Sequence, residues 1–190
     1  MDMLPELASR RARRAISGDT LGIEAVNRIV EAATLAPSCF NNQPWRLVAL
    51  ERDREGSAYE AVSAALTPGN AWATEAPLFL VFCTSAHLDC RLDQGRDYAF
   101  FDLGQACMAA QLQAWREGFY AHPMAGFSPQ KIKLALGLPP EVVPLCFMAV
   151  GKPGPNDRLS ESQKLDETSE RSRKPLSDVV FRDSWGKPWN

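Results

Sequence analysis

Segment 36–45 concentrates polar groups that could recognise a planar heterocycle. It reads Ala-Pro-Ser-Cys-Phe-Asn-Asn-Gln-Pro-Trp, so three carboxamides stand between two prolines. Each carboxamide offers a hydrogen-bond donor and an acceptor, which suits the alternating edge of such a ring. Because proline, serine and asparagine also favour turns, a helix end followed by a strand start is the structural alternative for this segment.

Two clusters of positive charge stand near opposite ends of the chain. Residues 10–14 read Arg-Arg-Ala-Arg-Arg, and residues 171–174 read Arg-Ser-Arg-Lys. The whole protein nevertheless carries a net charge of −2, from 21 basic and 23 acidic residues. That balance gives no reason to expect nucleic acid or a membrane surface as partner, and it favours one small anion over a long polyanion. A solvated helix face is the alternative for residues 10–14.

Cysteine and histidine usage predicts no metal site. The five cysteines, at 39, 83, 90, 107 and 146, form no Cys-x-x-Cys pair, and the two histidines are far apart. Cys83, Cys107 and Cys146 lie in apolar runs, where a free cysteine behaves as a small hydrophobe. Free thiols indicate a reducing, cytoplasmic setting. Cys39 is interpreted as the replacement of a small polar residue rather than as a redox group.

The elements that must position these groups follow from apolar spacing. The pattern predicts helices over residues 4–16, 23–33, 59–66 and 98–117, a helix starting at Ser128-Pro129, and strands over residues 46–50, 78–84, 119–122 and 142–150. The expected buried stripe of the longest helix is Phe101, Gly104, Met108, Leu112 and Trp115. Helices and strands mix without regular β-α-β alternation, which favours an α+β fold. No apolar run reaches the roughly 18 residues that a membrane helix needs.

Four segments, taken in order and at their separations, resemble the nitroreductase family of FMN-dependent oxidoreductases. They are residues 10–14, residues 37–45, the Pro-Met-Ala-Gly-Phe run at 123–127, and residues 171–176 with Trp185-Gly186. The resemblance covers nearly the whole chain. It implies a three-layer α/β/α sandwich in an intertwined homodimer. Residues 1–151 would form the FMN-binding core, and residues 152–190 a C-terminal arm of the same domain that wraps the partner subunit.

The resemblance also implies which residues hold the cofactor. Arg10 and Arg14 would bind the FMN phosphate, the ribityl chain or the pyrimidine edge, and Arg173 and Lys174 would lie near the phosphate. The loop at 37–43 would reach across the dimer interface, and Asn70 would read the flavin pyrimidine. Backbone N–H groups of 124–126 would face the flavin N5 region. The candidate cofactor-binding residues are Arg10, Arg11, Ala12, Arg14, Pro37, Ser38, Cys39, Asn41, Gln43, Asn70, Met124, Ala125, Gly126, Arg173 and Lys174. The family often has serine where this chain has Ala12, and many members carry a lysine shortly after the residue matching Asn70.

The implied activity is hydride transfer from NADH or NADPH through flavin to a nitroaromatic, quinone or activated-alkene acceptor, with ping-pong kinetics. No catalytic side chain is expected, because the cofactor carries the chemistry. The alternatives are another flavin reaction on the same scaffold, such as dehalogenation or flavin fragmentation, and a non-catalytic flavin-binding or sensor protein. A nucleic-acid-binding module using residues 10–14 is a third alternative, against which the acidic balance argues. The sequence does not distinguish NADH from NADPH, since it lacks a Gly-x-Gly-x-x-Gly fingerprint.

Overall fold

A four-stranded antiparallel sheet organises the molecule. The computed structural model describes residues 3–189. Its strands are β1 (Arg46–Glu51), β2 (Leu78–Thr84), β3 (Tyr120–Met124) and β4 (Val143–Gly151). They lie in the order β1-β2-β4-β3, and each neighbouring pair is antiparallel. The predicted α+β class is therefore confirmed.

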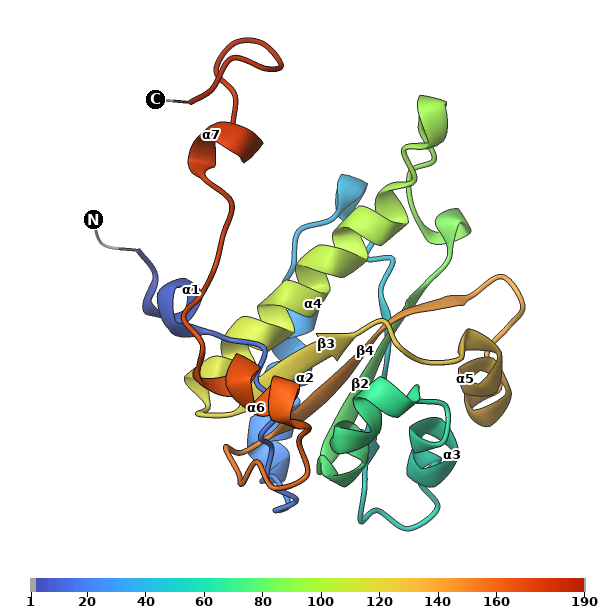
Figure 1. Ribbon diagram of the computed structural model, residues 1–190. Coiled ribbons are helices and arrows are strands. Elements are labelled where there is room, and N and C mark those ends of the chain that lie inside the picture. Colours follow the sequence, from blue (N-terminus) through green and yellow to red (C-terminus); the bar gives the residue numbers. More distant parts are fainter. Residues whose placement is uncertain (1–2, 190) are drawn as a thin grey trace.

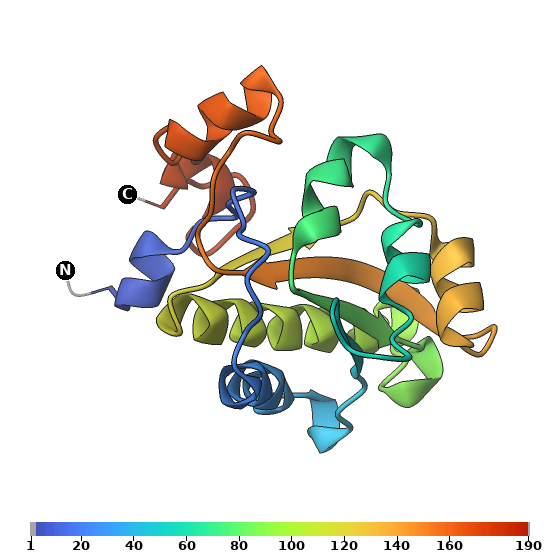
Figure 2. The same cartoon turned by 90° about the horizontal axis from the view of Figure 1, so that it is seen from below.

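Helices cover both faces of this sheet (Figures 1 and 2). The helices are α1 (Pro5–Ser9), α2 (Ile23–Thr34), α3 (Tyr59–Ser63), α4 (Tyr98–Arg116), α5 (Pro129–Leu136), α6 (Glu161–Thr168) and α7 (Leu176–Val179), with 3-10 turns η1 (Cys39–Asn41), η2 (Pro68–Glu75), η3 (Ala86–Leu88) and η4 (Asp93–Gly95). Figure 2 shows α2 and α4 on one side of the sheet and α3 and α5 on the other. This is the three-layer arrangement expected from the sequence.

The central strand β2 divides the core into two halves. All seven of its residues are buried, as expected for an uninterrupted apolar run covered on both faces. Successive side chains point to opposite faces. Leu78, Leu80 and Phe82 therefore join the cluster under α2 and α4, whereas Phe79 and Val81 join the cluster under α3, η2 and α5.

The expected buried stripe of α4 was wrong. The helix presents small side chains to the sheet and to α2, including Ala106 and Ala110, which are fully buried. Phe101 stands on another face and is 63% exposed. Alanine allows the close approach of helix and sheet, so the largest apolar residues are left outside this contact. Met108 and Leu112 of the predicted stripe instead line an apolar groove with Leu35, which is 78% exposed.

The predicted helix over 4–16 was also wrong, because α1 ends at Ser9. Residues 10–17 then run alongside the C-terminal segment in non-helical conformation, so Arg10 and Arg14 do not share a helix face. Arg171 donates hydrogen bonds to the carbonyl oxygens of Leu7 and Arg10, and the Glu167 carboxylate accepts from the Arg14 N–H at 2.8 Å. These long-range bonds replace those that a longer helix would have made.

Gly154 permits the closest contact between the segment after β4 and residues 15–17. A Cβ atom at this position would lie 2.4 Å from the Ser17 nitrogen and 2.7 Å from its Cα atom. The Gly154 N–H donates to the Ala15 carbonyl at 2.8 Å, and the Ser17 N–H donates to the Lys152 carbonyl at 2.8 Å. The chain after β4 is thus fastened to the segment that carries the first arginine cluster.

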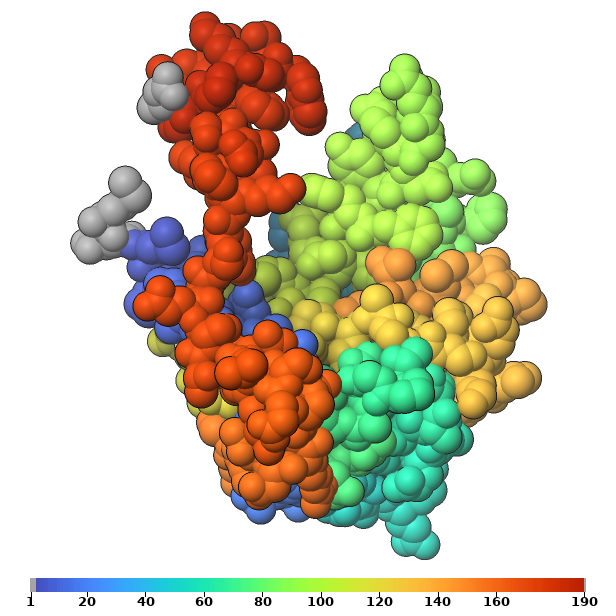
Figure 3. Space-filling view, viewed as in Figure 1, coloured from blue at the N-terminus to red at the C-terminus, as the bar shows by residue number. Residues whose placement is uncertain are grey.

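Beyond α6 the chain extends away from the body of the molecule (Figures 1 and 3). Leu176, Val179 and Trp185 are exposed there, Trp185 to 92%. The residues after α7 make a small hairpin of their own, in which Phe181 pairs with Pro188. Wrapping of a partner by residues 152–190 stays a prediction, and Asn190 lies outside the described residues. Within residues 3–189, no helix combines the length and the apolar character needed to span a bilayer.

Candidate functional site

Both arginine clusters line one pocket. It has a volume of about 340 Å³ and lies between the segment after α1 and the segment after α6. Its lining residues are Arg10, Arg11, Ala12, Arg14, Asp166, Ser169, Glu170, Arg171, Ser172 and Arg173. The structure therefore brings together the first and last of the four sequence segments. Lys174, the remaining basic candidate, is exposed and is not part of the lining.

Hydrogen bonds hold the pocket in shape. Arg14 forms an ion pair with Asp166 of α6 at 3.1 Å, which draws the two chain ends together. Arg11 donates to the Ser169 carbonyl at 2.9 Å, and Arg10 donates to the Gln111 side chain of α4 at 3.2 Å. The pocket is thus preformed within one chain.

The electrostatics of this pocket suit an anion. Among residues 3–189, Arg10, Arg11, Arg171 and Arg173 form no ion pair with a carboxylate. Burial lowers the pKa of Arg10, and the positive charges of Arg171, Arg173 and Arg11 lower it further. A bound anion would relieve the repulsion among these guanidinium groups and accept their hydrogen bonds.

A second group of candidates lies around Gly126. The Thr67 N–H, the Thr67 hydroxyl and the Asn70 amide all donate to the Gly126 carbonyl at 3.0 Å. A Cβ atom on Gly126 would lie 2.6 Å from Asn70 Nδ2 and 2.7 Å from Thr67 Oγ1. Glycine is therefore required for this close approach. Met124 is buried at the end of β3, and Ala125 is exposed beside it.

His122 and η2 connect the arginine pocket with this Gly126 region. His122 Nδ1 lies 3.3 Å from the Arg13 carbonyl oxygen, and its ring packs edge-on against Trp72 of η2 at 4.8 Å between centroids. From the other side, Gln163 of α6 donates to the Gly69 carbonyl at 3.1 Å. The pocket and the loop 124–126 are thus parts of one continuous region along β3.

His122 should make stability depend on pH. Burial, followed by the charge of Arg14, lowers the pKa of His122 from 6.5 to about 4. The unfolded state protonates His122 more readily than the folded state does. The contribution of His122 to the free energy of unfolding is therefore fully present above about pH 6.5 and is lost as the pH falls towards 4. Between pH 7 and 4.5 the loss from this group should be about 2–3 kcal/mol. Urea unfolding of the protein and of His122→Gln at both pH values should show a smaller loss in the variant; equal losses would contradict the assignment.

The loop at 37–43 is tied to itself and to α4. Gln43 N–H donates to the Ser38 hydroxyl at 3.0 Å, and its side chain donates to Asn41 Oδ1 at 3.2 Å. The Cys39 N–H donates to the Asp102 carboxylate at 2.7 Å. Asn41 and Gln43 have φ values of 57° and 49°, in the left-handed region that costs non-glycine residues energy. Such strain often accompanies functional loops.

No hydrogen bond or ion pair within residues 3–189 joins this loop to the arginine pocket or to Gly126. Pro37 instead borders a groove with Leu35, Met108 and Leu112. Within one chain, the arginine pocket and the Gly126 region therefore lie together, whereas the loop at 37–43 stands apart from both. Trp45, the last residue of the segment 36–45, is 6% exposed and belongs to the core, so it is a packing residue.

Several residues that line or support the pocket were missed in the sequence. Arg171 lies in the basic cluster but was not selected, and it anchors the fold of residues 7–10. Glu167 and Asp166 stand in a polar stretch without a motif, so nothing local distinguishes them. Only the pairing of the two chain ends shows their role.

The sheet between two helical layers, with a cationic pocket built from both chain ends, defines an α+β protein prepared to bind a small anion. The model of the nitroreductase family matches residues 7–152. The chain therefore belongs to the nitroreductase family and is an oxidoreductase by that membership.

Individual relatives agree with this assignment. An NADH dehydrogenase of Thermus thermophilus is 30% identical, with 84% of this chain and 92% of that protein covered. A 5,6-dimethylbenzimidazole synthase of Rhodospirillum rubrum is also 30% identical, with 85% and 87% covered. The crystal structure of an oxidoreductase containing FMN superimposes with a TM-score of 0.86 at 27% identity, covering 98% of this chain and 94% of the other.

Proposed function

We propose that this protein is an FMN-dependent oxidoreductase that takes hydride from NADH or NADPH and reduces a nitroaromatic, quinone or activated alkene by a ping-pong mechanism. The observation that supports this proposal most strongly is the arginine pocket, which continues along β3 to the Gly126 region. Bound FMN would supply the hydride and electron transfer. The Thermus relative is named for NADH, and the superimposed crystal structure contains FMN.

The pocket fits the terminal phosphate of FMN. A phosphomonoester carries nearly two negative charges and strong acceptor oxygens, which guanidinium groups match. Arg10, Arg11 and Arg173 would hold it, since no carboxylate among the described residues engages their side chains. Arg14 would act mainly by orienting the segment, because Asp166 already pairs with it. Ala12 supplies no hydroxyl.

The Gly126 region would accept the flavin ring. Asn70 carries the polar side chain for the pyrimidine edge, and its amide is fixed by the Gly126 carbonyl at 3.0 Å. Met124, Ala125 and Gly126 would present backbone along the ring. Gly126 N–H forms no backbone hydrogen bond with another described residue, so it stays free to donate.

The loop at 37–43 would complete the site from a second copy of the chain. Within one chain, Pro37 of this loop borders an exposed apolar groove that Leu35, Met108 and Leu112 also line. Burying that surface in a homodimer would remove apolar area from water. Pro37, Ser38, Cys39, Asn41 and Gln43 would then belong to the partner's cofactor site, with the C-terminal arm closing over the interface.

The proposed setting is cytoplasmic, and the partners are a second copy and a small-molecule acceptor. Five free cysteines fit a reducing compartment. Neither nucleic acid nor a membrane is proposed as partner, since the net charge is −2 and the clustered arginines converge on one small pocket.

A second candidate is another flavin reaction on this scaffold. The Rhodospirillum relative is named as a synthase, so members of similar length and identity do not share one reaction. A flavin-binding or sensor protein without turnover is the remaining alternative. Sustained NAD(P)H oxidation distinguishes the reductase from both.

We expect purified protein to oxidise NADH or NADPH steadily when a quinone or nitroaromatic is added. Initial rates at several acceptor concentrations should give parallel double-reciprocal lines, because the two substrates react in separate half-reactions. Converging lines would contradict the ping-pong mechanism. No turnover with any acceptor class would favour the sensor or the synthase reaction.

A further inference from the structure

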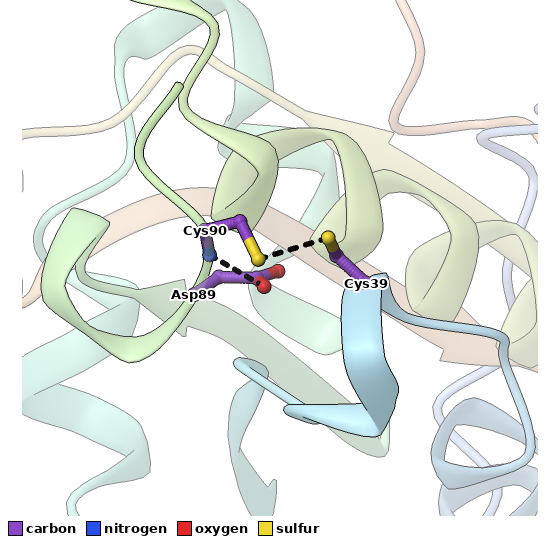
Figure 4. Close-up of side chains that lie close together, drawn as sticks. All are labelled: Cys39, Asp89 and Cys90. Atoms are coloured by element: carbon purple, nitrogen blue, oxygen red, sulfur yellow. Dashed lines mark hydrogen bonds between the residues drawn. The ribbon is translucent and has the colours of Figure 1, made fainter.

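A compact group of metal-ligating side chains lies away from the arginine pocket, where the loop at 37–43 meets the segment that precedes α4. Cys39 belongs to η1, whereas Asp89 and Cys90 follow η3 and come from the segment between β2 and α4. One ligand atom from each residue lies within 4.8 Å of the other two. Figure 4 shows the three side chains gathered together. The two sulfur atoms lie 2.9 Å apart. We propose that Cys39, Asp89 and Cys90 bind a thiophilic divalent cation such as Zn²⁺, with solvent as the fourth ligand.

The Asp89 carboxylate is oriented by donors on one oxygen and faces a second carboxyl. Its Oδ1 atom accepts from Asn42 at 2.9 Å and from the Cys90 N–H at 2.7 Å. Its Oδ2 atom is buried and accepts from no N–H or hydroxyl donor among the described residues, while the Asp102 carboxyl lies within hydrogen-bonding reach of the Asp89 carboxylate. Two carboxyl groups this close need a proton or a cation between them, and a divalent cation would fill that place. The bonded oxygen fixes the orientation of the group, as outer-shell donors do in metal sites.

Asn42 also supports the sulfur ligand. Its side-chain amide lies 3.6 Å from Cys90 Sγ, besides donating to Asp89. An amide donor directed at two ligand atoms favours their anionic forms, which a metal requires. Asn42 would therefore be a positioning residue that does not touch the ion.

Negative charge accumulates around these thiols. The Asp102 carboxylate of α4 accepts the Cys39 N–H at 2.7 Å, so two acidic side chains, Asp89 and Asp102, stand beside the thiols and repel each other when both are ionised. A divalent cation would offset this repulsion, and the thiols would lose their protons on binding it.

Oxidation to a disulfide is the alternative chemistry for this pair of thiols. It would need an oxidant such as a hydroperoxide, to which the two thiols would give up two electrons with the release of two protons.

The geometry requires only a small adjustment. Zinc–sulfur bonds of about 2.3 Å in a tetrahedral site place two sulfur atoms about 3.8 Å apart. The present 2.9 Å separation would have to open by about 1 Å, which side-chain rotation allows. The ion would tie the loop at 37–43 to the segment that precedes α4.

The test is zinc binding by the reduced, tag-free holoprotein. Dialysis against Zn²⁺ followed by elemental analysis should give one ion per chain, and zinc X-ray absorption should show two sulfur neighbours at about 2.3 Å. Cys90→Ser should lose the ion, and Asn42→Ala should bind it about 10- to 100-fold more weakly. Cys83→Ala is the matched control, since this buried thiol lies inside β2, and it should retain one ion.

Three results would overturn the proposal. They are less than one ion per chain in the unmodified reduced protein, coordination by nitrogen and oxygen alone, and undiminished binding by Cys90→Ser. A Cys39–Cys90 disulfide after hydroperoxide treatment, in a protein that takes up no zinc when reduced, would assign the pair to redox chemistry instead. The absorption measurement on the unmodified protein stands even where a variant does not fold.

Discussion

Replacing Arg173 with alanine should weaken FMN binding by about tenfold to a hundredfold and leave riboflavin binding nearly unchanged. One charge-assisted hydrogen bond to phosphate contributes about 1.5–3 kcal/mol, and riboflavin has no phosphate. The Arg173 guanidinium lines the pocket and, among residues 3–189, donates only to the neighbouring Ser172 carbonyl at 2.6 Å. Its removal should therefore not disturb the fold. Quenching of flavin fluorescence measures both affinities.

Lys174 provides the matched control. It stands next to Arg173 and has the same sign of charge, but it does not line the pocket. Lys174→Ala should change FMN affinity little, and the double change should match Arg173→Ala alone. Arg10→Ala should act in the same direction but also loses the bond to Gln111, so it is the less specific test. Equal losses for FMN and riboflavin would mean that the C-terminal cluster acts through folding or subunit contacts.

Deleting residues 176–190 should convert a dimer into a monomer and strip it of most of its flavin. In one chain, Leu176, Val179 and Trp185 are exposed apolar residues on a segment that extends from the body. Their exposure is understandable if a partner subunit covers them. Light scattering after size-exclusion chromatography and the ratio of flavin to protein absorbance measure the two effects.

A point variant distinguishes the loss of the Trp185 side chain from the loss of the whole segment 176–190. Trp185→Ala should weaken the dimer although Trp185 is 92% exposed in one chain, where its loss would otherwise cost little. A truncated protein that remains a flavin-loaded dimer, or a full-length protein that is monomeric, would contradict the proposed arm.

The sheet could be predicted because its strands carry strong local signals. β2 is an uninterrupted apolar run, and its predicted bounds, Leu78–Thr84, are those observed. Helix α5 began where Ser128 and Pro129 indicated, since the serine hydroxyl caps the Lys131 N–H. These elements depend on residues within a few positions of one another.

Other features depended on residues far apart in the chain. The end of α1 is set by Arg171, about 160 residues away, so residues 10–14 had the pattern of a helix but not its partners. The inward face of α4 was misassigned because Phe101 is apolar but belongs to an outward surface. Cys39 and Cys90 are 51 residues apart, and no spacing rule joins them. Local residue spacing predicts the secondary structure that a segment prefers, whereas packing against distant residues decides where the element ends and which of its faces is buried.

The most direct test of the central claim is anaerobic reduction of the protein's own flavin. Purified protein should be yellow, should release FMN rather than FAD on denaturation, and should lose its flavin absorbance after about one equivalent of NADH or NADPH. Adding a quinone without oxygen should restore the absorbance. Protein that binds no FMN at micromolar concentrations, or bound FMN that neither nucleotide reduces, would contradict the account.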